Sequence, residues 1–307
     1  MKKNFISNKK LLGSFCILIF LLSITLINIK TYNEQTIETF NLIEDNTVIK
    51  RDFNGDGEKD VLYIKKHNEK YYLQINIKNS SYELIPNNNL KTLGSYSITW
   101  PIRITIKDLN RDNLPEIILQ STDDNIPIQH IFSWDIDNFK DIFNSKNNIV
   151  GFNDISNNKS PKFISGNFYN GEMYFKNYML INKKAMNYST NYPSNFLGKD
   201  TITNFINFLQ GNDSLKEKVV LSMEEGLIDQ FFQLSTNGYK LTFQDAIFED
   251  LKSDKNGEVK NIKWKLNFKG SNGEGIKNFT VTLQLREQLK DKNKEYIIYY
   301  INTENLM

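Results

Sequence analysis

The stretch that most constrains the fold runs from Asp52 to Asp60, because oxygen-bearing side chains recur there at alternate positions. Ca²⁺ takes about six to eight oxygen ligands, and a tightly curled loop turns every second side chain inward. Gly57 occupies the sixth position, where a sharp turn favours a residue free to take positive φ. The pattern predicts a Ca²⁺ site whose ligands are Asp52, Asn54, Asp56, the backbone carbonyl of Glu58, and Asp60.

The segments on both sides of this loop have the composition of strands. Residues 47–49 and 61–64 are β-branched, aromatic or aliphatic, as strands are. In an EF-hand, helices flank the loop and a glutamate stands at the twelfth position, which here is Tyr63. We therefore expect the loop to join two strands.

The same alternation recurs twice. The first ligand positions are 52, 108 and 154, and spacings of 56 and 46 residues suit a four-stranded propeller blade. In the second copy Asn113 replaces the glycine, and asparagine tolerates the left-handed region. The third copy ends in Lys162, which cannot ligate a cation, so no metal is expected there. The predicted ligands of the second copy are Asp108, Asn110, Asp112, the carbonyl of Leu114, and Glu116.

These copies resemble the FG-GAP repeat, also called the VCBS repeat, of integrin-type β-propellers, over roughly residues 45–192. The resemblance implies that each loop joins two strands of a blade and binds Ca²⁺, and it implies no activity. Three blades are fewer than the usual four to eight. An open partial propeller, completion by the C-terminal part, and closure by self-association all remain open. The alternative for the loops is that they are acidic turns that bind nothing.

The N-terminus has the features of a membrane anchor. Residues 11–29 form an apolar run without a charge, and four lysines precede it. Such a run is long enough to span a bilayer, and the lysines would hold the N-terminus inside. We expect a cytoplasmic tail at 1–10, an uncleaved transmembrane signal-anchor at 11–29 and a stalk at 30–45. A cleaved signal peptide is the alternative, but the run is followed by no small-residue cleavage triplet.

The rest of the chain predicts two modules. Residues 46–192 would form the FG-GAP-like β-repeat domain, and residues 196–307 an α+β domain. In the latter we expect two helices followed by a four-stranded antiparallel sheet. This order is similar to cone-like folds of the nuclear-transport-factor or cystatin type, an analogy that no motif supports. The helices are predicted at 201–209 and about 213–234, and the strands at 239–251, 259–268, 279–285 and 296–301.

Composition limits the chemistry. A net charge of +2 argues against nucleic-acid binding. Cys16, in the apolar run, is the sole cysteine, and His67 and His130 are the only histidines, which disfavours cysteine or histidine catalysis. The tryptophans fall on strand patterns and read as core or sheet-face residues. The remaining catalytic candidates are the pairs Glu224–Glu225 and Asp123–Asp124.

We therefore expect a single-pass cell-membrane protein whose bulk lies outside the cytoplasm and binds Ca²⁺. Its role would be structural or binding, at the cell envelope, with an envelope protein or a polysaccharide as partner. The alternative is a carboxylate-based envelope hydrolase acting on polysaccharide. A deep acidic cleft would favour the hydrolase, whereas a flat or shallow surface would favour binding. The sequence leaves the oligomeric state open.

Overall fold

The computed structural model describes residues 38–39, 48–153, 162–189, 196–235, 238–290 and 293–306. Residues 38–307 form one compact unit, which in the described residues is mostly β, with three short α-helices. The third copy of the loop, residues 154–162, lies outside the described residues except for Lys162.

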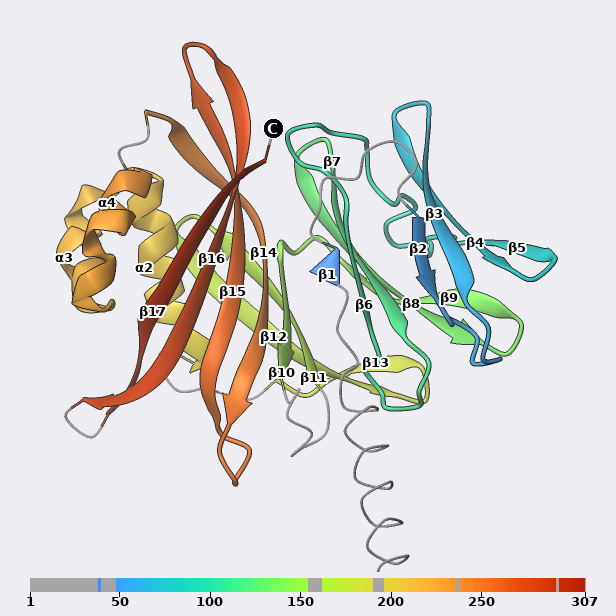
Figure 1. Cartoon of the computed structure of the whole chain (residues 1–307). Coiled ribbons are helices and arrows are strands. Elements are labelled where there is room, and N and C mark those ends of the chain that lie inside the picture. Colours follow the sequence, from blue (N-terminus) through green and yellow to red (C-terminus); the bar gives the residue numbers. More distant parts are fainter. Residues whose placement is uncertain are drawn as a thin grey trace, which may run out of the picture. The chain divides into compact units, whose positions relative to one another are not determined.

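Three antiparallel meanders of four strands follow one another along the chain (Figure 1). The first comprises β2 (Val48–Arg51), β3 (Asp60–His67), β4 (Lys70–Ile77) and β5 (Ser80–Glu83). The second comprises β6 (Arg103–Lys107), β7 (Glu116–Asp123), β8 (Ile126–Asp135) and β9 (Asn138–Ser145), with β1 (Glu38–Thr39) paired to β6. The third comprises β10 (Ile149–Asn153), β11 (Lys162–Tyr169), β12 (Glu172–Ile181) and β13 (Lys184–Asn187).

Each of the three loop copies lies in sequence between the first two strands of its meander. The closing pairs are Arg51 with Asp60, Lys107 with Glu116, and Asn153 with Lys162. The prediction that the loops lie between strands is therefore confirmed. The ninth loop residue is also the first residue of a strand, so its position is fixed by the strand's hydrogen bonds.

The second meander is buried on both faces, which explains its long apolar runs. In β7, Ile117 belongs to a core shared with the first meander, where it is clustered with Leu62 and Leu73. The adjacent residue, Ile118, points the other way into a core shared with Val150 of β10. Successive side chains of a strand alternate between faces, so one strand supplies both cores.

The four C-terminal strands do not form a sheet of their own. They are β14 (Lys240–Ser253), β15 (Val259–Asn272), β16 (Gly275–Lys290) and β17 (Asn293–Leu306). β14 pairs in parallel with β10, giving one sheet in the order β13-β12-β11-β10-β14-β15-β16-β17. The predicted four-stranded sheet is therefore wrong, although its antiparallel meander is correct. Gly151 of β10 makes room for Phe248 of β14: a Cβ there would lie 2.0 Å from the ring's Cζ.

The helices pack on this eight-stranded sheet. Ile202 and Phe205 of α2 (Lys199–Leu209) and Phe231 of α4 (Ile228–Ser235) share a core with Leu266. The predicted helix at 201–209 is confirmed as α2. The predicted single helix to about residue 234 is instead broken into α3 (Lys216–Leu221) and α4.

The break between α3 and α4 has a structural cause. Ile298 of β17 donates its N–H to the Ser222 carbonyl at 2.8 Å and accepts from the Glu224 N–H at 3.0 Å. Backbone groups used in this way are lost to a helix. The segment protects the middle of the edge strand β17, as natural proteins commonly do. Short 3₁₀ helices complete the connections: η1 (Phe196–Gly198), η2 (Asp213–Leu215) and η3 (Glu225–Leu227).

The predicted fold class needs correction. The described chain consists of open sheets with three short helices, not a transmembrane helix, a propeller-like module and a separate α+β domain. No helix among the described residues is long and apolar enough to cross a membrane, so the predicted single-pass membrane localisation is not supported. The segments 1–10, 11–29 and 30–45 lie outside the described residues, apart from Glu38–Thr39. The domain bounds 46–192 and 196–307 stay a prediction.

Candidate functional site

In the first loop, the predicted ligand side chains accept hydrogen bonds from the loop's own backbone. Asp52 accepts from the N–H groups of Gly55 and Gly57, at 2.7 and 2.9 Å. Such contacts hold a tight turn without help from the rest of the chain. The other acceptors are Asn54 from the Asp56 N–H (3.1 Å), Asp56 from the Glu58 N–H (2.9 Å) and Asp60 from the Phe53 N–H (2.8 Å).

The second loop repeats these contacts position by position. Asp108 accepts from the N–H groups of Arg111 and Asn113, at 2.6 and 3.0 Å. Asn113 has φ 67°, matching φ 85° at Gly57, as the sequence predicted. Two segments that share so few residues thus adopt the same conformation. The remaining acceptors are Asn110 from the Asp112 N–H (2.9 Å), Asp112 from the Leu114 N–H (2.8 Å) and Glu116 from the Leu109 N–H (2.7 Å).

The second residue of each loop is a buried apolar anchor. Phe53 and Leu109 both pack into a hydrophobic core, and their N–H groups bind the carboxyl group at the ninth position. Our sequence reasoning missed these anchors. A signal was present, because the second residue is apolar in all three copies, including Ile155.

The ninth residues, Asp60 and Glu116, carry buried carboxyl groups. Burial raises the pKa of Glu116 to about 8, and the negative charges of Asp112 and Asp108 also raise it. Burial likewise raises the pKa of Asp60, with further contributions from Asp56 and Asp52. Negative charge is therefore most costly at this end of each loop.

A lysine from another turn engages the first loop. The Lys78 ammonium lies 2.8 Å from Oδ2 of Asp56. Its hydrogen bond, aided by the N–H of Glu58, lowers the pKa of Asp56 to about 2. Asp56 is therefore ionised at neutral pH and forms an ion pair with the Lys78 ammonium.

The two loops touch each other. A Cβ added to Gly55, at the fourth position of the first loop, would lie 2.6 Å from Cδ2 of Leu114 in the second. Leu114 packs against the core shared by the first two meanders. The fold thus brings together two loops that are far apart in sequence.

Replacing Gly55 by alanine should lower the free energy of unfolding by about 1–3 kcal/mol. Its φ of 80° is unfavourable for alanine, and the new methyl group would collide with Leu114. Gly57→Ala is the matched control, because φ there is 85° and no atom lies within 4 Å of the added Cβ. It should cost only about 1 kcal/mol of backbone strain. Urea titration measures both.

The Leu114→Ala background isolates the contact between the loops. There, the cost of Gly55→Ala should fall to that of Gly57→Ala, because the colliding side chain is gone. Equal costs for both glycine variants in the wild-type background would contradict the close approach of the two loops.

The donor chemistry of both loops fits Ca²⁺, since carboxylate, amide and carbonyl oxygens are its preferred ligands. The side chains are, however, turned onto backbone N–H groups and Lys78. In the described part of the chain, no three or more His, Cys, Asp or Glu side chains are gathered as a metal-binding group. The ten predicted ligands therefore stay a prediction.

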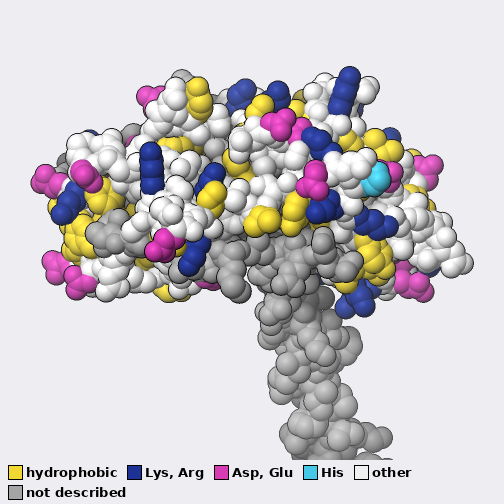
Figure 2. All heavy atoms as spheres, turned by 90° about the horizontal axis from the view of Figure 1, so that it is seen from above, with side chains coloured by type: hydrophobic (Ala, Val, Ile, Leu, Met, Phe, Trp, Pro, Cys, Tyr) yellow, Lys and Arg dark blue, Asp and Glu magenta, His cyan; other side chains and the backbone are white. Residues whose placement is uncertain are grey.

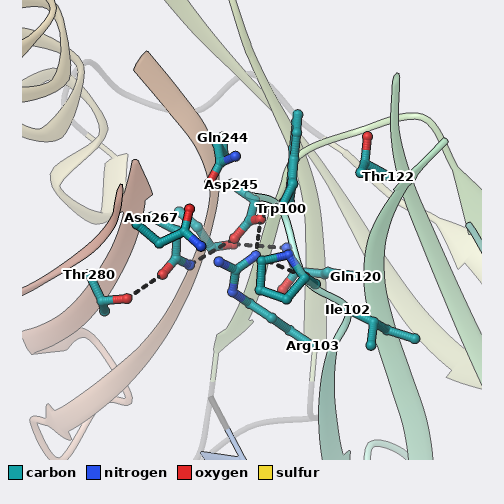
Figure 3. Close-up of polar contacts among 12 residues, drawn as sticks. Trp100, Ile102, Arg103, Gln120, Thr122, Gln244, Asp245, Asn267 and Thr280 are labelled. Atoms are coloured by element: carbon teal, nitrogen blue, oxygen red, sulfur yellow. Dashed lines mark hydrogen bonds and ion pairs between the residues drawn. The ribbon is translucent and has the colours of Figure 1, made fainter. Parts of the chain in front are cut away.

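A second polar cluster is buried where β6 meets β14 (Figure 3). Arg103 forms an ion pair with Asp245, and the two side chains are 4% and 2% exposed, respectively. Asp245 also accepts from Trp100 Nε1 at 2.6 Å and from Asn267 Nδ2 at 2.8 Å. Thr280 then donates to Asn267 at 2.7 Å. The cluster is enclosed by protein, so we interpret it as a joint between the sheets. The donor role of Trp100 was not foreseen.

The proposed catalytic pairs are engaged singly. Asp123 accepts from Lys70 and Ser95, and Glu224 pairs with Arg286 at 2.7 Å. His130 is buried between Asp141 and the Thr92 carbonyl, each at 2.9 Å. These contacts provide structural roles and do not bring a catalytic set together.

Two cavities in the described part of the chain lack the acidic character expected of a hydrolase cleft. One, of about 520 Å³, contains Lys216, Lys240 and a single acid, Asp213. The other, of about 580 Å³ on β3–β5, contains two lysines with Glu83. On the face seen in Figure 2, basic and acidic side chains are interspersed.

The comparison with known families agrees with the geometry of the loops. Residues 52–119 match the model of the FG-GAP-like repeat. The match begins at the first ligand position of the first loop and ends in β7, so this FG-GAP-like repeat contains both loops and covers roughly a fifth of the chain. The predicted family is confirmed there, whereas a propeller is not. Among curated proteins, none is significantly similar to this chain. The FG-GAP-like repeat indicates a binding or structural role of the extracellular type.

Proposed function

We propose that this chain is a Ca²⁺-binding protein with a structural or binding role, and that each loop of its FG-GAP-like repeat takes one Ca²⁺. The observation that carries this proposal is the matching placement of four acceptor side chains, at positions one, three, five and nine, in the two loops. The oxygens that hold each turn stand at the alternate positions from which a curled loop can bind Ca²⁺.

Each loop offers oxygen donors of the kind that Ca²⁺ prefers. Side chains at the first, third, fifth and ninth positions, with the carbonyls of Glu58 and Leu114, would hold the ion. The bound cation would supply positive charge beside the buried carboxyl groups of Asp60 and Glu116. Because those residues begin β3 and β7, a bound ion would tie each loop to its sheet.

A binding partner at the cell envelope, either a protein or a polysaccharide, is part of this proposal. A hydrolase has less support, because the acidic pairs lie apart from both cavities described above.

Thermal unfolding of the full chain tests Ca²⁺ binding. We expect millimolar Ca²⁺ to raise Tm relative to excess chelator, because an ion bound only by the folded state adds about 2.7 kcal/mol per site at one hundred times its Kd. Asp56→Asn and Asp112→Asn should each remove part of the rise. Both amides can still accept the loop N–H group, so their stability in chelator should change little.

Asp254→Asn is the matched control for the two loop variants. Asp254 accepts N–H groups from Asn256 and Glu258, at 2.9 and 3.0 Å, in a hairpin turn far along the sequence from the repeat. It should keep the full Ca²⁺ response. An unchanged Tm of the wild type on adding Ca²⁺ would overturn the proposed function. If only one of the two loop variants reduces the rise in Tm, the loop of the other variant is not a Ca²⁺ site.

A further inference from the structure

Lys78 lies where it can act on the first loop without belonging to it. It follows β4 in the two-residue turn between the paired residues Ile77 and Ser80. From there its ammonium reaches Oδ2 of Asp56, at 2.8 Å. Asp56 is the fifth residue of the loop, and its other oxygen, Oδ1, accepts from the Glu58 N–H. The lysine therefore binds the carboxylate oxygen that accepts no backbone N–H group, and it shares this oxygen with the Asn54 amide at 3.2 Å.

The charge of Lys78 acts on more of the loop than Asp56 alone. The hydrogen bond from Lys78 to Asp56 raises the pKa of the lysine, and the negative charges of Glu58 and Asp60 contribute. The ammonium thus contacts Asp56 and is also influenced by the charges of Glu58 and Asp60. Its side chain is 56% exposed, so it can swing into water on its flexible stem without breaking core contacts.

A cation at the first loop must share this negative charge with Lys78. A divalent ion bound to Asp56 would displace the ammonium or lie beside it, and like charges at short range repel. Both outcomes weaken binding relative to a neutral residue at position 78.

We propose that Lys78 is a built-in competitor of Ca²⁺ at the first loop, which raises the Ca²⁺ concentration needed to fill that loop. This inference rests on the proposed function. Without Ca²⁺, the Lys78 ammonium neutralises part of the negative charge of the loop. When Ca²⁺ binds, the ammonium is released to solvent. The first loop would then respond to a rise in Ca²⁺ and would not remain permanently loaded.

The second loop provides an internal reference. In both loops, Oδ2 of the fifth residue accepts from the amide of the third, at 3.2 Å from Asn54 and 3.1 Å from Asn110. In the first loop Lys78 shares this oxygen. Asp112→Asn weakens the second loop, so that the remaining Ca²⁺ binding reports on the first.

Lys78→Asn in the Asp112→Asn background is the decisive variant of the full chain. Asparagine tolerates the left-handed conformation found at Lys78, where φ is 49°, so the turn should be kept. Isothermal titration of the chelator-treated protein with CaCl₂ should show about 5- to 30-fold tighter binding than in Asp112→Asn alone. Lys78→Gln should give the same result with a longer neutral side chain.

Lys140→Asn is the matched charge control, because Lys140 pairs with Asp135 in the separate β8–β9 hairpin. It changes the net charge equally and should leave the Ca²⁺ affinity within about twofold, since an exposed and distant charge is screened. Unchanged or weaker binding in both Lys78 variants, with Ca²⁺ still bound by the wild type, would overturn the role of Lys78. Absence of Ca²⁺ binding by the wild type would overturn the proposed function itself.

Discussion

Replacing Asp245 by alanine is expected to lower the free energy of unfolding by about 3–5 kcal/mol, because it leaves the Arg103 guanidinium buried without its counter-charge. Burial raises the pKa of Asp245 and lowers that of Arg103, so each charge depends on its partner. The Trp100 and Asn267 donors would lose their acceptor as well. Equilibrium unfolding in urea, followed by tryptophan fluorescence and circular dichroism, measures the loss.

Two controls separate the buried pair from a general charge effect. Asp135→Ala removes a partly exposed partner of Lys140 and Lys183 and should cost about 1 kcal/mol or less. The double variant Arg103→Met, Asp245→Leu should be far less destabilised than the sum of its single variants, because no unpaired charge remains. A loss below about 1 kcal/mol for Asp245→Ala would contradict the ion pair shown in Figure 3.

Replacing Trp264 by alanine should also cost about 3–5 kcal/mol, through lost burial and the cavity left behind. Trp264 is fully buried, with its ring stacked 4.2 Å from the centroid of Phe248 and 6.3 Å from that of Phe175. Its indole N–H donates to the Leu197 carbonyl at 3.3 Å. These contacts join β15 to β14, to β12 and to η1, so several elements lose packing together. The shift in Tm measures the effect.

Trp264→Phe should recover part of this loss, because a phenyl ring can still stack on Phe248 but cannot donate to Leu197. Tyr300→Ala on β17 is the surface control. Its side chain is 41% exposed, and the cost should be within about 1 kcal/mol. Equal effects of Trp264→Ala and Tyr300→Ala would contradict the stacked core.

The candidate site was predictable to the extent that it is local. The loops 52–60 and 108–116 contain their own turn-forming acceptors and flanking strands, so their placement between strands follows from short-range pattern. The anchoring role of Phe53 and Leu109 was not predicted. Their apolar character is evident from the sequence, but their burial depends on sheets assembled from other segments. The contact between Lys78 and Asp56 was not predicted either, because it depends on how β4 pairs with β3 and with β5.

The C-terminal hairpins were predicted correctly, whereas the unbroken helix and the transmembrane segment were not supported, and each outcome has a physical reason. The antiparallel hairpins of β14–β17 have strong turn signals and alternating faces, so they were foreseen. Helical spacing predicted one unbroken helix to about residue 234. It carries no information on the hydrogen bonds that Ile298 makes with the backbone of Ser222 and Glu224, which break the helix. The transmembrane prediction came from residues 11–29, which lie outside the described residues, and no described helix supports it.

The sequence by itself determined the repeating loop-and-strand unit, because alternation of polar and apolar side chains and the turn chemistry of Asp, Asn and Gly act over a few residues. Only the tertiary structure decided that β10 pairs with β14, that Gly55 touches Leu114, and that Asp245 is a buried partner of Arg103. An aspartate in a strand pattern is by itself indistinguishable from a solvent-exposed one. Its burial is fixed only when a strand more than a hundred residues away brings the matching charge.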